Sequence, residues 1–323
     1  MKEKNAIMSD AAKVIAERKS YAEKQRDERL EKIAEWAPEY KALKEEFTAC
    51  GIKLSRLAIQ GKIGSEEFQT IYARMSELDK AMTAEIEKAG FPADYLDNVY
   101  VCSKCKDTGS FTSESGETEM CSCLKCVFGK LLVKESGIPV TKGYEAYNLR
   151  IFAENEQKNA QKRFDELMAM IKNFPNGANC LVTGKTGVGK TYNACIIGTE
   201  LAKSGKQSVY VTMPDLMRTL TYFGDDEKLC FDRDTMGKVV RECDYLIIDE
   251  LGAEKLSDTK LELFTSIIDS RLSDETKGTR IITNHTLKEL FGIYGERVFS
   301  RLSSMKIENL ELESDTDLRR VII

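Results

Sequence analysis

The sequence predicts an α/β fold in which helices cover both faces of a parallel sheet, preceded by a helical region and a small cysteine-rich module. From about residue 151 to the end, short apolar runs of strand length alternate with helical patterns. Such alternation is typical of a three-layer α/β domain. The first 98 residues are instead dense in charges of both signs and poor in strand formers, which predicts helices.

The apolar runs place five strands, and proline, serine and glycine punctuate the helical region. Pro38 suits the first turn of a helix, so we expect one helix to end near Glu35 and a second to begin there. The second carries an apolar stripe and ends at Gly51, and Ser65 caps a third. The stripes on these helices serve either a bundle core or a partner surface. The expected strands are Asn179–Thr183, Ser208–Thr212, Tyr245–Ile248, Arg280–Thr283 and Lys306–Leu312.

Composition restricts the functional classes. Hydrophobic residues make up 42% of the 323-residue chain, enough for a substantial core. No apolar run approaches the roughly 20 residues that span a bilayer, and the N-terminus lacks the apolar core of a signal peptide. We therefore expect a cytoplasmic protein without a membrane partner. The net charge of −5 argues against a surface devoted wholly to nucleic acid, while a local basic channel stays compatible with it.

A glycine-rich octet, GKTGVGKT, follows the first expected strand and precedes a helical pattern. This context and spacing predict a phosphate-binding loop. Its glycines allow backbone N–H groups to surround phosphate oxygens, Lys190 supplies a positive charge, and the Thr191 hydroxyl can bind Mg²⁺. The chain is therefore expected to bind ATP with magnesium. The candidate nucleotide contacts are Gly184, Lys185, Thr186, Gly187, Val188, Gly189, Lys190 and Thr191.

Polar residues at the ends of two later strands complete a candidate ATPase site. Asp249 and Glu250 follow the apolar run YLII, where Asp249 can hold Mg²⁺ and Glu250 can polarise the attacking water. Asn284 ends the next strand, and its amide can hold that water. His285, the single histidine, is assigned no catalytic role. The sequence thus predicts hydrolysis as well as binding of ATP.

Arginines that could stabilise the transferred phosphate lie near the C-terminus. Arg297 and Arg301 are one helical turn apart on one face of an expected helix. Arginine stabilises the charge of a transferring phosphate when a neighbouring subunit supplies it. Arg319 and Arg320 could also reach the nucleotide. Ordinary solvated arginines are the alternative for all four.

Two close pairs of cysteines have metal-ligand spacing. The motifs CSKC and CSC stand 15 residues apart, and four thiolates in two turns can enclose Zn²⁺ in a tetrahedron. Cys126 forms a competing C-x-x-C with Cys123, and an iron–sulfur cluster or unliganded cysteines are the alternatives to zinc. A four-thiolate site leaves no open position, so its role is structural. The favoured ligands are Cys102, Cys105, Cys121 and Cys123, with Cys126 in reserve.

These motifs together resemble the DnaC/DnaI-like replicative helicase loaders of the AAA+ ATPases, in the form found in low-GC Gram-positive bacteria and their phages. GKTGVGKT, LIIDELGAE, ITNHT and GERVFSRL occur in the family's order as Walker A, Walker B, sensor 1 and arginine-finger helix. The cysteine motifs look like the family's zinc-binding module. By this resemblance Arg301 is the finger with Arg297 beside it, and Arg319 is similar to the sensor 2 position.

The resemblance implies partners and a domain plan. It implies that the N-terminal helices bind a DnaB-type replicative helicase and that the ATPase domains self-associate, up to a hexamer or spiral, and grip single-stranded DNA. The segment MPDLMRTLTYF, with Arg218, Tyr222 and Phe223, suits such a DNA contact, as does core packing. The alternatives are an IstB-like transposition helper ATPase and an ATP-switch scaffold with negligible turnover. The expected domains are a helicase-interaction region (1–98), a zinc-binding module (99–130), a linker (131–150) and an AAA+ ATPase domain (151–323).

Overall fold

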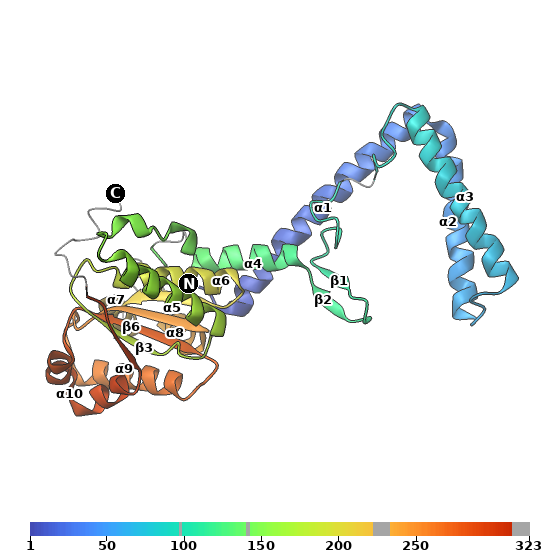
Figure 1. The fold of residues 1–323 in the computed structure, drawn as a ribbon. Coiled ribbons are helices and arrows are strands. Elements are labelled where there is room, and N and C mark those ends of the chain that lie inside the picture. The colour runs from blue at the N-terminus through green and yellow to red at the C-terminus, as the bar shows by residue number, and fades with distance from the viewer. Residues whose placement is uncertain (97–98, 140–142, 222–232, 312–323) are drawn as a thin grey trace. The chain divides into compact units, whose positions relative to one another are not determined.

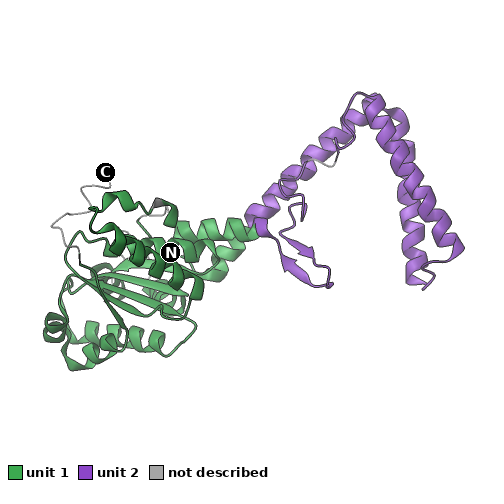
Figure 2. Ribbon diagram, viewed as in Figure 1, with its two compact units in different colours: residues 1–11, 124–323 green, residues 12–123 purple. Residues whose placement is uncertain are grey.

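The chain forms two compact units. The computed structural model describes all residues except 97–98, 140–142, 222–232 and 312–323. One unit comprises residues 1–11 and 124–323, and the other comprises residues 12–123 (Figure 2). The domain limits inferred from the sequence stay predictions, and each unit is described by itself below.

A five-stranded parallel sheet forms the centre of the first unit (Figure 1). Its strand order is β4-β5-β6-β3-β7, and every neighbouring pair is parallel. All five expected strands are confirmed; Ser208–Thr212 has the expected bounds, and each of the others is shifted at one end by one to three residues. The bounds are β3 Cys180–Thr183, β4 Ser208–Thr212, β5 Tyr245–Leu251, β6 Gly278–Thr283 and β7 Lys306–Asn309.

Helices cover both faces of this sheet, because successive side chains of each strand point to opposite sides. Leu181, Ile248 and Ile281 pack in one core with α7 to α10, whereas Val182 and Ile282 pack in another with α5 and α6. The predicted three-layer α/β class is confirmed. The covering helices are α5 Gln157–Asn173, α6 Lys190–Lys203, α7 Met213–Thr221, α8 Arg233–Glu242, α9 Asp258–Leu272 and α10 Leu287–Ser303.

The second unit contains a helical hairpin and the cysteine module. α1 (Lys4–Trp36) enters it from the first unit, and α2 (Pro38–Ile59) packs against α3 (Glu66–Lys88). Pro38 lies in the first turn of α2, and the Ser65 side chain accepts a hydrogen bond from the Phe68 backbone N–H at 3.2 Å. The cap predicted from Ser65 and the break at Pro38 are thus confirmed.

The predicted end of the second helix at Gly51 is wrong, because α2 continues through this glycine to Ile59. An interior glycine costs about 0.5–1 kcal/mol relative to alanine. Burial of Cys50 and Leu57 on either side of it offsets that cost. On α3, Leu78 and Met82 are buried, but Tyr72 of the same stripe is 65% exposed. Only part of the stripe therefore belongs to a core.

Five further short elements complete the described chain. The hairpin of β1 (Ser110–Thr112) and β2 (Thr118–Met120) lies in the cysteine module, and α4 (Ser122–Glu135) follows it. Two short 3-10 helices, η1 (Tyr144–Ala146) and η2 (Leu149–Ile151), precede α5. Within the described part of the chain, no helix is long and apolar enough to cross a membrane.

Candidate functional site

The glycine-rich loop lies between β3 and α6, where the sequence pattern predicts it. β3 is buried throughout, and α6 begins at Lys190 directly after the loop. Gly184, Gly187 and Gly189 have φ values of 140°, 87° and 90°, which disfavour any residue with a side chain. A Cβ atom at Gly184 would also lie 2.1 Å from the Leu310 carbonyl oxygen. The loop conformation therefore requires glycine, as a backbone cradle for phosphate does.

Lys190 points its ammonium group back over this loop. Its Nζ donates to the carbonyl oxygens of Gly184 at 2.7 Å and Lys185 at 2.8 Å, and to Asn284 Oδ1 at 2.8 Å. The side chain is buried, and it stands at the N-terminus of α6, where the helix dipole favours anions. A buried cation beside a glycine-rich loop at a helix N-terminus is suited to an anionic phosphate.

A hydroxyl and a carboxylate meet beside the loop at a candidate Mg²⁺ position. Thr191 Oγ1 donates to Asp249 Oδ2 at 2.6 Å, and the Tyr210 hydroxyl donates to the same oxygen at 3.0 Å. Asp249 is 5% exposed. These oxygens are of the type that Mg²⁺ prefers, and in P-loop proteins the ion binds this hydroxyl and a β-strand aspartate. The side chains present therefore fit a magnesium-bound nucleotide.

Tyr210 is a part of the site that the sequence analysis missed. It lies on β4, the neighbour of β5, and burial, together with the Asp249 carboxylate, raises the pKa of its hydroxyl. The hydroxyl therefore stays protonated and donates to Asp249. The one available signal was a tyrosine in an otherwise apolar strand, because buried tyrosine hydroxyls usually find a partner.

Glu250 and Asn284 are at the same edge of the sheet as the loop. The β5–β6 register shifts between Ile248 and Leu251, and Glu250 adopts φ 59°. A non-glycine residue in this region is strained, and such strain is common at functional sites. The Glu250 side chain is exposed, so it can reach a bound ligand and water. Asn284 contacts Lys190 directly, as noted above, and thereby adjoins the phosphate loop.

An aromatic pocket next to the loop was also missed. It is lined by Tyr147, Phe152 and Tyr192 together with Val188 and Gly189 of the loop. The rings of Tyr147 and Phe152 are stacked with their centroids 6.2 Å apart. Its volume is only about 20 Å³, so the pocket adjoins the phosphate loop but is too small, as it stands, for the base of a nucleotide. Tyr147 and Phe152 belong to the segment YEAYNLRIF, most of which falls in the expected linker (131–150).

Arg297 and Arg301 both lie in the C-terminal part of α10, which is interrupted at Gly295. The Arg301 Nη2 donates to Asp269 Oδ2 on α9 at 3.0 Å, and Nη1 donates to the Arg297 carbonyl oxygen at 2.6 Å. Arg297 is exposed. Arg301 thus contacts α9 and α10 of its own chain rather than the phosphate loop. Arg319 and Arg320 lie outside the described residues, as do Tyr222 and Phe223.

Four cysteines in the second unit form a compact cluster. Their sulfur atoms all lie within 4.8 Å of one another, with Cys102 and Cys121 at 3.7 Å and Cys105 and Cys123 at 3.3 Å. A zinc tetrahedron with Zn–S bonds of about 2.3 Å has edges of about 3.8 Å, so the thiols fit this ion. Cys126 is not in the cluster and is exposed.

Local hydrogen bonds hold the first cysteine turn in place. Buried Asp107 accepts from the backbone N–H groups of Val101 at 2.9 Å and Cys102 at 3.0 Å. At the second pair, a backbone hydrogen bond from Cys123 lowers the pKa of the Cys121 thiol to about 6, whereas burial and the neighbouring thiols raise the pKa of Cys123. Thiolate character at neutral pH favours metal binding. Asp107 was not singled out from the sequence, where it is one of many acidic residues.

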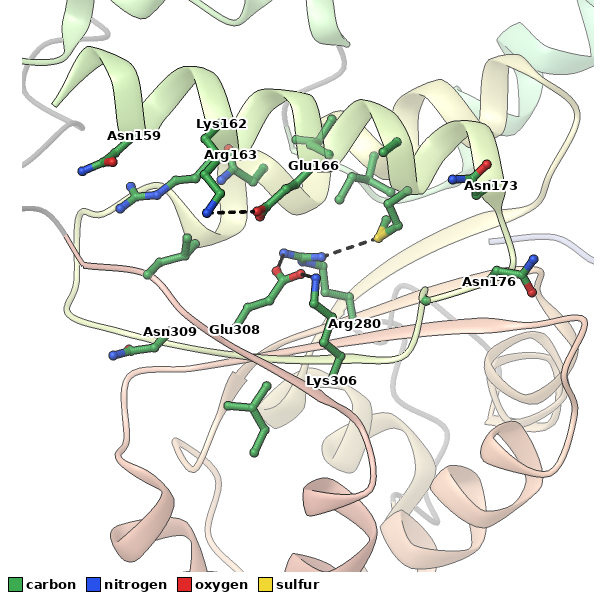
Figure 3. Close-up of a pocket in the computed structure, with 18 residues that line it drawn as sticks. Asn159, Lys162, Arg163, Glu166, Asn173, Asn176, Arg280, Lys306, Glu308 and Asn309 are labelled. Carbon is green, nitrogen blue, oxygen red and sulfur yellow. Dashed lines mark hydrogen bonds and ion pairs between the residues drawn. The ribbon is translucent and has the colours of Figure 1, made fainter.

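A cavity of about 640 Å³ lies between α5 and β7 (Figure 3). Its floor carries Arg280, which is 4% exposed and hydrogen-bonded through Nη2 to Glu308 Oε2 at 2.5 Å. Lys306 contacts the same carboxylate at 3.1 Å. The lining comes from α5, α6, β6 and β7 rather than from the phosphate loop, so this cavity is not the nucleotide site.

This buried ion pair leads to a prediction about stability. Replacing Glu308 by glutamine will lower the free energy of unfolding by about 3 kcal/mol, because Arg280 loses its carboxylate in the interior. Burial alone would raise the pKa of Glu308, but the charges of Arg280 and Lys306 lower it below the ordinary 4.5. The contribution is therefore complete above that pH and is lost as pH falls through the lowered folded-state value.

Urea unfolding at pH 7 and at pH 4 measures both effects. Glu166→Gln is the matched control, because Glu166 lies on the opposite wall and its partner Lys162 is 4.0 Å away and largely exposed. An exposed pair of this kind contributes less than about 1 kcal/mol. Equal losses for the two variants would contradict the prediction.

The fold and the site together define a P-loop ATP-binding protein of the AAA+ class. The glycine-rich loop follows β3, the carboxylates lie near the carboxyl end of β5 and the polar amide follows β6, all in one parallel sheet. The chain belongs to the family of IstB-like ATP binding proteins, whose model matches residues 130–302. The DnaC/DnaI-like resemblance found in the motifs is confirmed, with the four-cysteine cluster N-terminal to the ATP-binding domain.

Individual relatives are similar over different lengths. The YdaV protein of Escherichia coli (strain K12) is 26% identical over 53% of this chain and 67% of its own. The replicative helicase loader DnaC of the same strain is 27% identical over 71% of this chain and 87% of its own. Two crystal structures are also similar. The structure of the DnaC helicase loader is 26% identical, with a TM-score of 0.42, and the match covers 52% of this chain and all of that one. The structure of DnaI is 20% identical, with a TM-score of 0.41, and the match covers 53% of this chain and 93% of that one.

Proposed function

We propose that the protein is an ATP-dependent loader that binds a DnaB-type replicative helicase in the cytoplasm and helps to place it on single-stranded DNA. The observation that supports this most is the length of the DnaC match. The match covers 71% of this chain. The residues from 130 to the end make up a smaller share, so the similarity extends into the N-terminal region. A transposition helper that shares only the IstB-like domain would not account for that extension.

The site geometry supports hydrolysis of ATP at subunit interfaces. Lys190 and the loop N–H groups would bind the phosphates, and Thr191 with Asp249 would hold Mg²⁺. Glu250 would polarise the attacking water, and Asn284 would orient it. Arg301 would stabilise the transition state of a neighbouring subunit, and for this it must exchange Asp269 for phosphate. This role requires self-association of the ATPase domains, up to a hexamer or spiral.

The four-cysteine cluster is proposed to bind one Zn²⁺ as a structural ion. The sulfur positions fit a tetrahedron, and the hairpin of β1 and β2 has only three residues in each strand. A hairpin of this size is marginally stable by itself, so an ion would supply most of its folding energy.

The helicase contact is proposed to lie on the α2–α3 hairpin, which exposes large apolar side chains. Ile59 is 88% exposed and Ile63, in the turn that follows α2, is 70% exposed. Adjacent exposed apolar residues mark a protein interaction surface. We predict that Ile59→Glu with Ile63→Glu will reduce capture of a DnaB-type helicase by at least tenfold in co-purification, since lost apolar burial at an interface centre costs more than about 1.4 kcal/mol.

Ile307→Glu is the matched control, because Ile307 is also exposed, at 42%, but lies on β7 of the ATP-binding unit. It should capture the helicase as well as the parent does. Helicase capture that is insensitive to the double substitution would argue against this surface. Recovery of a transposase in place of the helicase would support the IstB-like alternative.

A further inference from the structure

The helix that carries Arg297 and Arg301 changes direction at Gly295. This residue has φ 70° and ψ 175°, a region that is essentially restricted to glycine. A Cβ atom there would meet nothing within 4 Å, so the glycine is required by the backbone angles and not by lack of space. The position of Tyr294, which directly precedes the break, therefore sets the direction of the helical segment that carries the two arginines.

Tyr294, which directly precedes the break on its N-terminal side, is anchored in the fold. It is 3% exposed, and its ring packs against Phe264 of α9 with the centroids 5.9 Å apart. Its hydroxyl donates a hydrogen bond to Glu254 Oε1. Burial and the adjacent Glu254 carboxylate raise the pKa of Tyr294, so the hydroxyl remains a donor at neutral pH. The residue next to the break is thus fixed by a charge-assisted hydrogen bond in the interior.

Glu254 connects this anchor to the loop that leaves the ATP site. Its second oxygen, Oε2, accepts from the Gly252 backbone N–H at 3.0 Å. The same loop is fixed on its other side, because Thr283 Oγ1 donates to the Leu251 carbonyl oxygen at 2.8 Å. A Cβ atom at Gly252 would lie 2.4 Å from the His285 ring. The loop after Glu250 therefore has little freedom to move independently of Glu254.

We propose that Glu254 and Tyr294 are positioning residues that couple the ATP site of one subunit to the arginine it presents to the next. This rests on the proposed role of Arg301 at a neighbouring site. One carboxylate bridges the loop that follows the catalytic carboxylates and the residue that precedes the break in α10. A shift of that loop with nucleotide state would turn the arginine-bearing segment about Gly295, which is the movable element that coupling requires.

A mixed-subunit assay tests the coupling in the full-length protein. Donor subunits carry Glu250→Gln, so they bind ATP without hydrolysing it and still offer Arg301. Acceptor subunits carry Arg301→Ala, so hydrolysis of the ATP that they bind depends on the Arg301 of a neighbouring donor. Adding Tyr294→Phe to the donor should lower the kcat of the mixture about tenfold, the effect of losing one charge-assisted hydrogen bond, with the acceptor's KM for ATP unchanged. The same substitution in the acceptor should leave kcat within twofold.

The subunit that carries Tyr294→Phe distinguishes a positioning role from a loss of stability, because a loss of stability would lower activity from either subunit. Equal losses in donor and acceptor, no loss in the donor, or a loss expressed in KM would overturn the proposal. Glu254→Ala in the donor should reproduce the effect, and Glu254→Gln, which keeps a hydrogen-bond acceptor, should restore part of the activity. A mixture with unmodified Tyr294 that is no more active than its separate components would overturn the role of Arg301 itself, a result distinct from failure of the coupling alone.

Discussion

Replacing Glu250 by glutamine will leave ATP binding intact and lower kcat for hydrolysis by at least 100-fold. The substitution preserves size but removes the charge that can polarise the attacking water, and a general base contributes about 10²–10⁴ to rate. Binding should survive because the phosphate contacts come from Lys190 and the loop, while Thr191 and Asp249 remain available to Mg²⁺. Phosphate release gives kcat, and titration with a fluorescent ATP analogue gives Kd.

Glu275→Gln provides the matched control. Glu275 is exposed and lies just before the amino end of β6, at the opposite edge of the sheet from Asn284. Its substitution should change neither kcat nor Kd. An unchanged kcat in the Glu250 variant would contradict the assigned role. A parent protein that binds ATP but releases no phosphate, even with DNA and helicase present, would favour the ATP-switch scaffold.

The parts of the site that the sequence predicts are those encoded by adjacent residues. Gly184 to Thr191 form the loop within eight positions, and the central strands carry apolar runs because helices cover both faces of the sheet. The order of these motifs along the chain was therefore enough to predict the AAA+ class. Lys190 and Asn284 were assigned to one ATPase site, and their contact follows because parallel strands end at one edge of the sheet.

The parts that the sequence does not predict depend on tertiary contacts between distant residues. Tyr210 meets Asp249 across 39 positions, and Glu254 meets Tyr294 across 40. Neither pair has a local pattern. Arg280 was placed correctly in a strand, but its burial depends on Glu308 from β7. The helix through Gly51 shows the converse, because burial of its neighbours against other helices outweighs the local preference of glycine.

Loss of the metal from the cysteine cluster will unfold the module around residues 102–123. The ATP-binding unit will stay folded. Structural zinc sites contribute about 10–16 kcal/mol at neutral pH, whereas β1 and β2 pair over only three residues. Cys105→Ser should therefore lose bound zinc and raise hydrogen exchange in this module. ATP affinity should change less than twofold, because the nucleotide contacts lie in the other compact unit.

Comparison of two further serine variants assigns the fourth ligand. Cys123→Ser should lose the ion and Cys126→Ser should retain it, because the Cys123 sulfur lies 3.3 Å from that of Cys105 and Cys126 lies outside the cluster. The reverse result would make Cys126 the ligand, which requires the first turn of α4 to rearrange. Metal analysis that finds iron together with visible absorbance would replace zinc by an iron–sulfur cluster. Purified protein with neither metal would contradict the metal site. The compact cysteine arrangement would then be held by Asp107 and the hairpin alone, and these are too few contacts for a segment this polar.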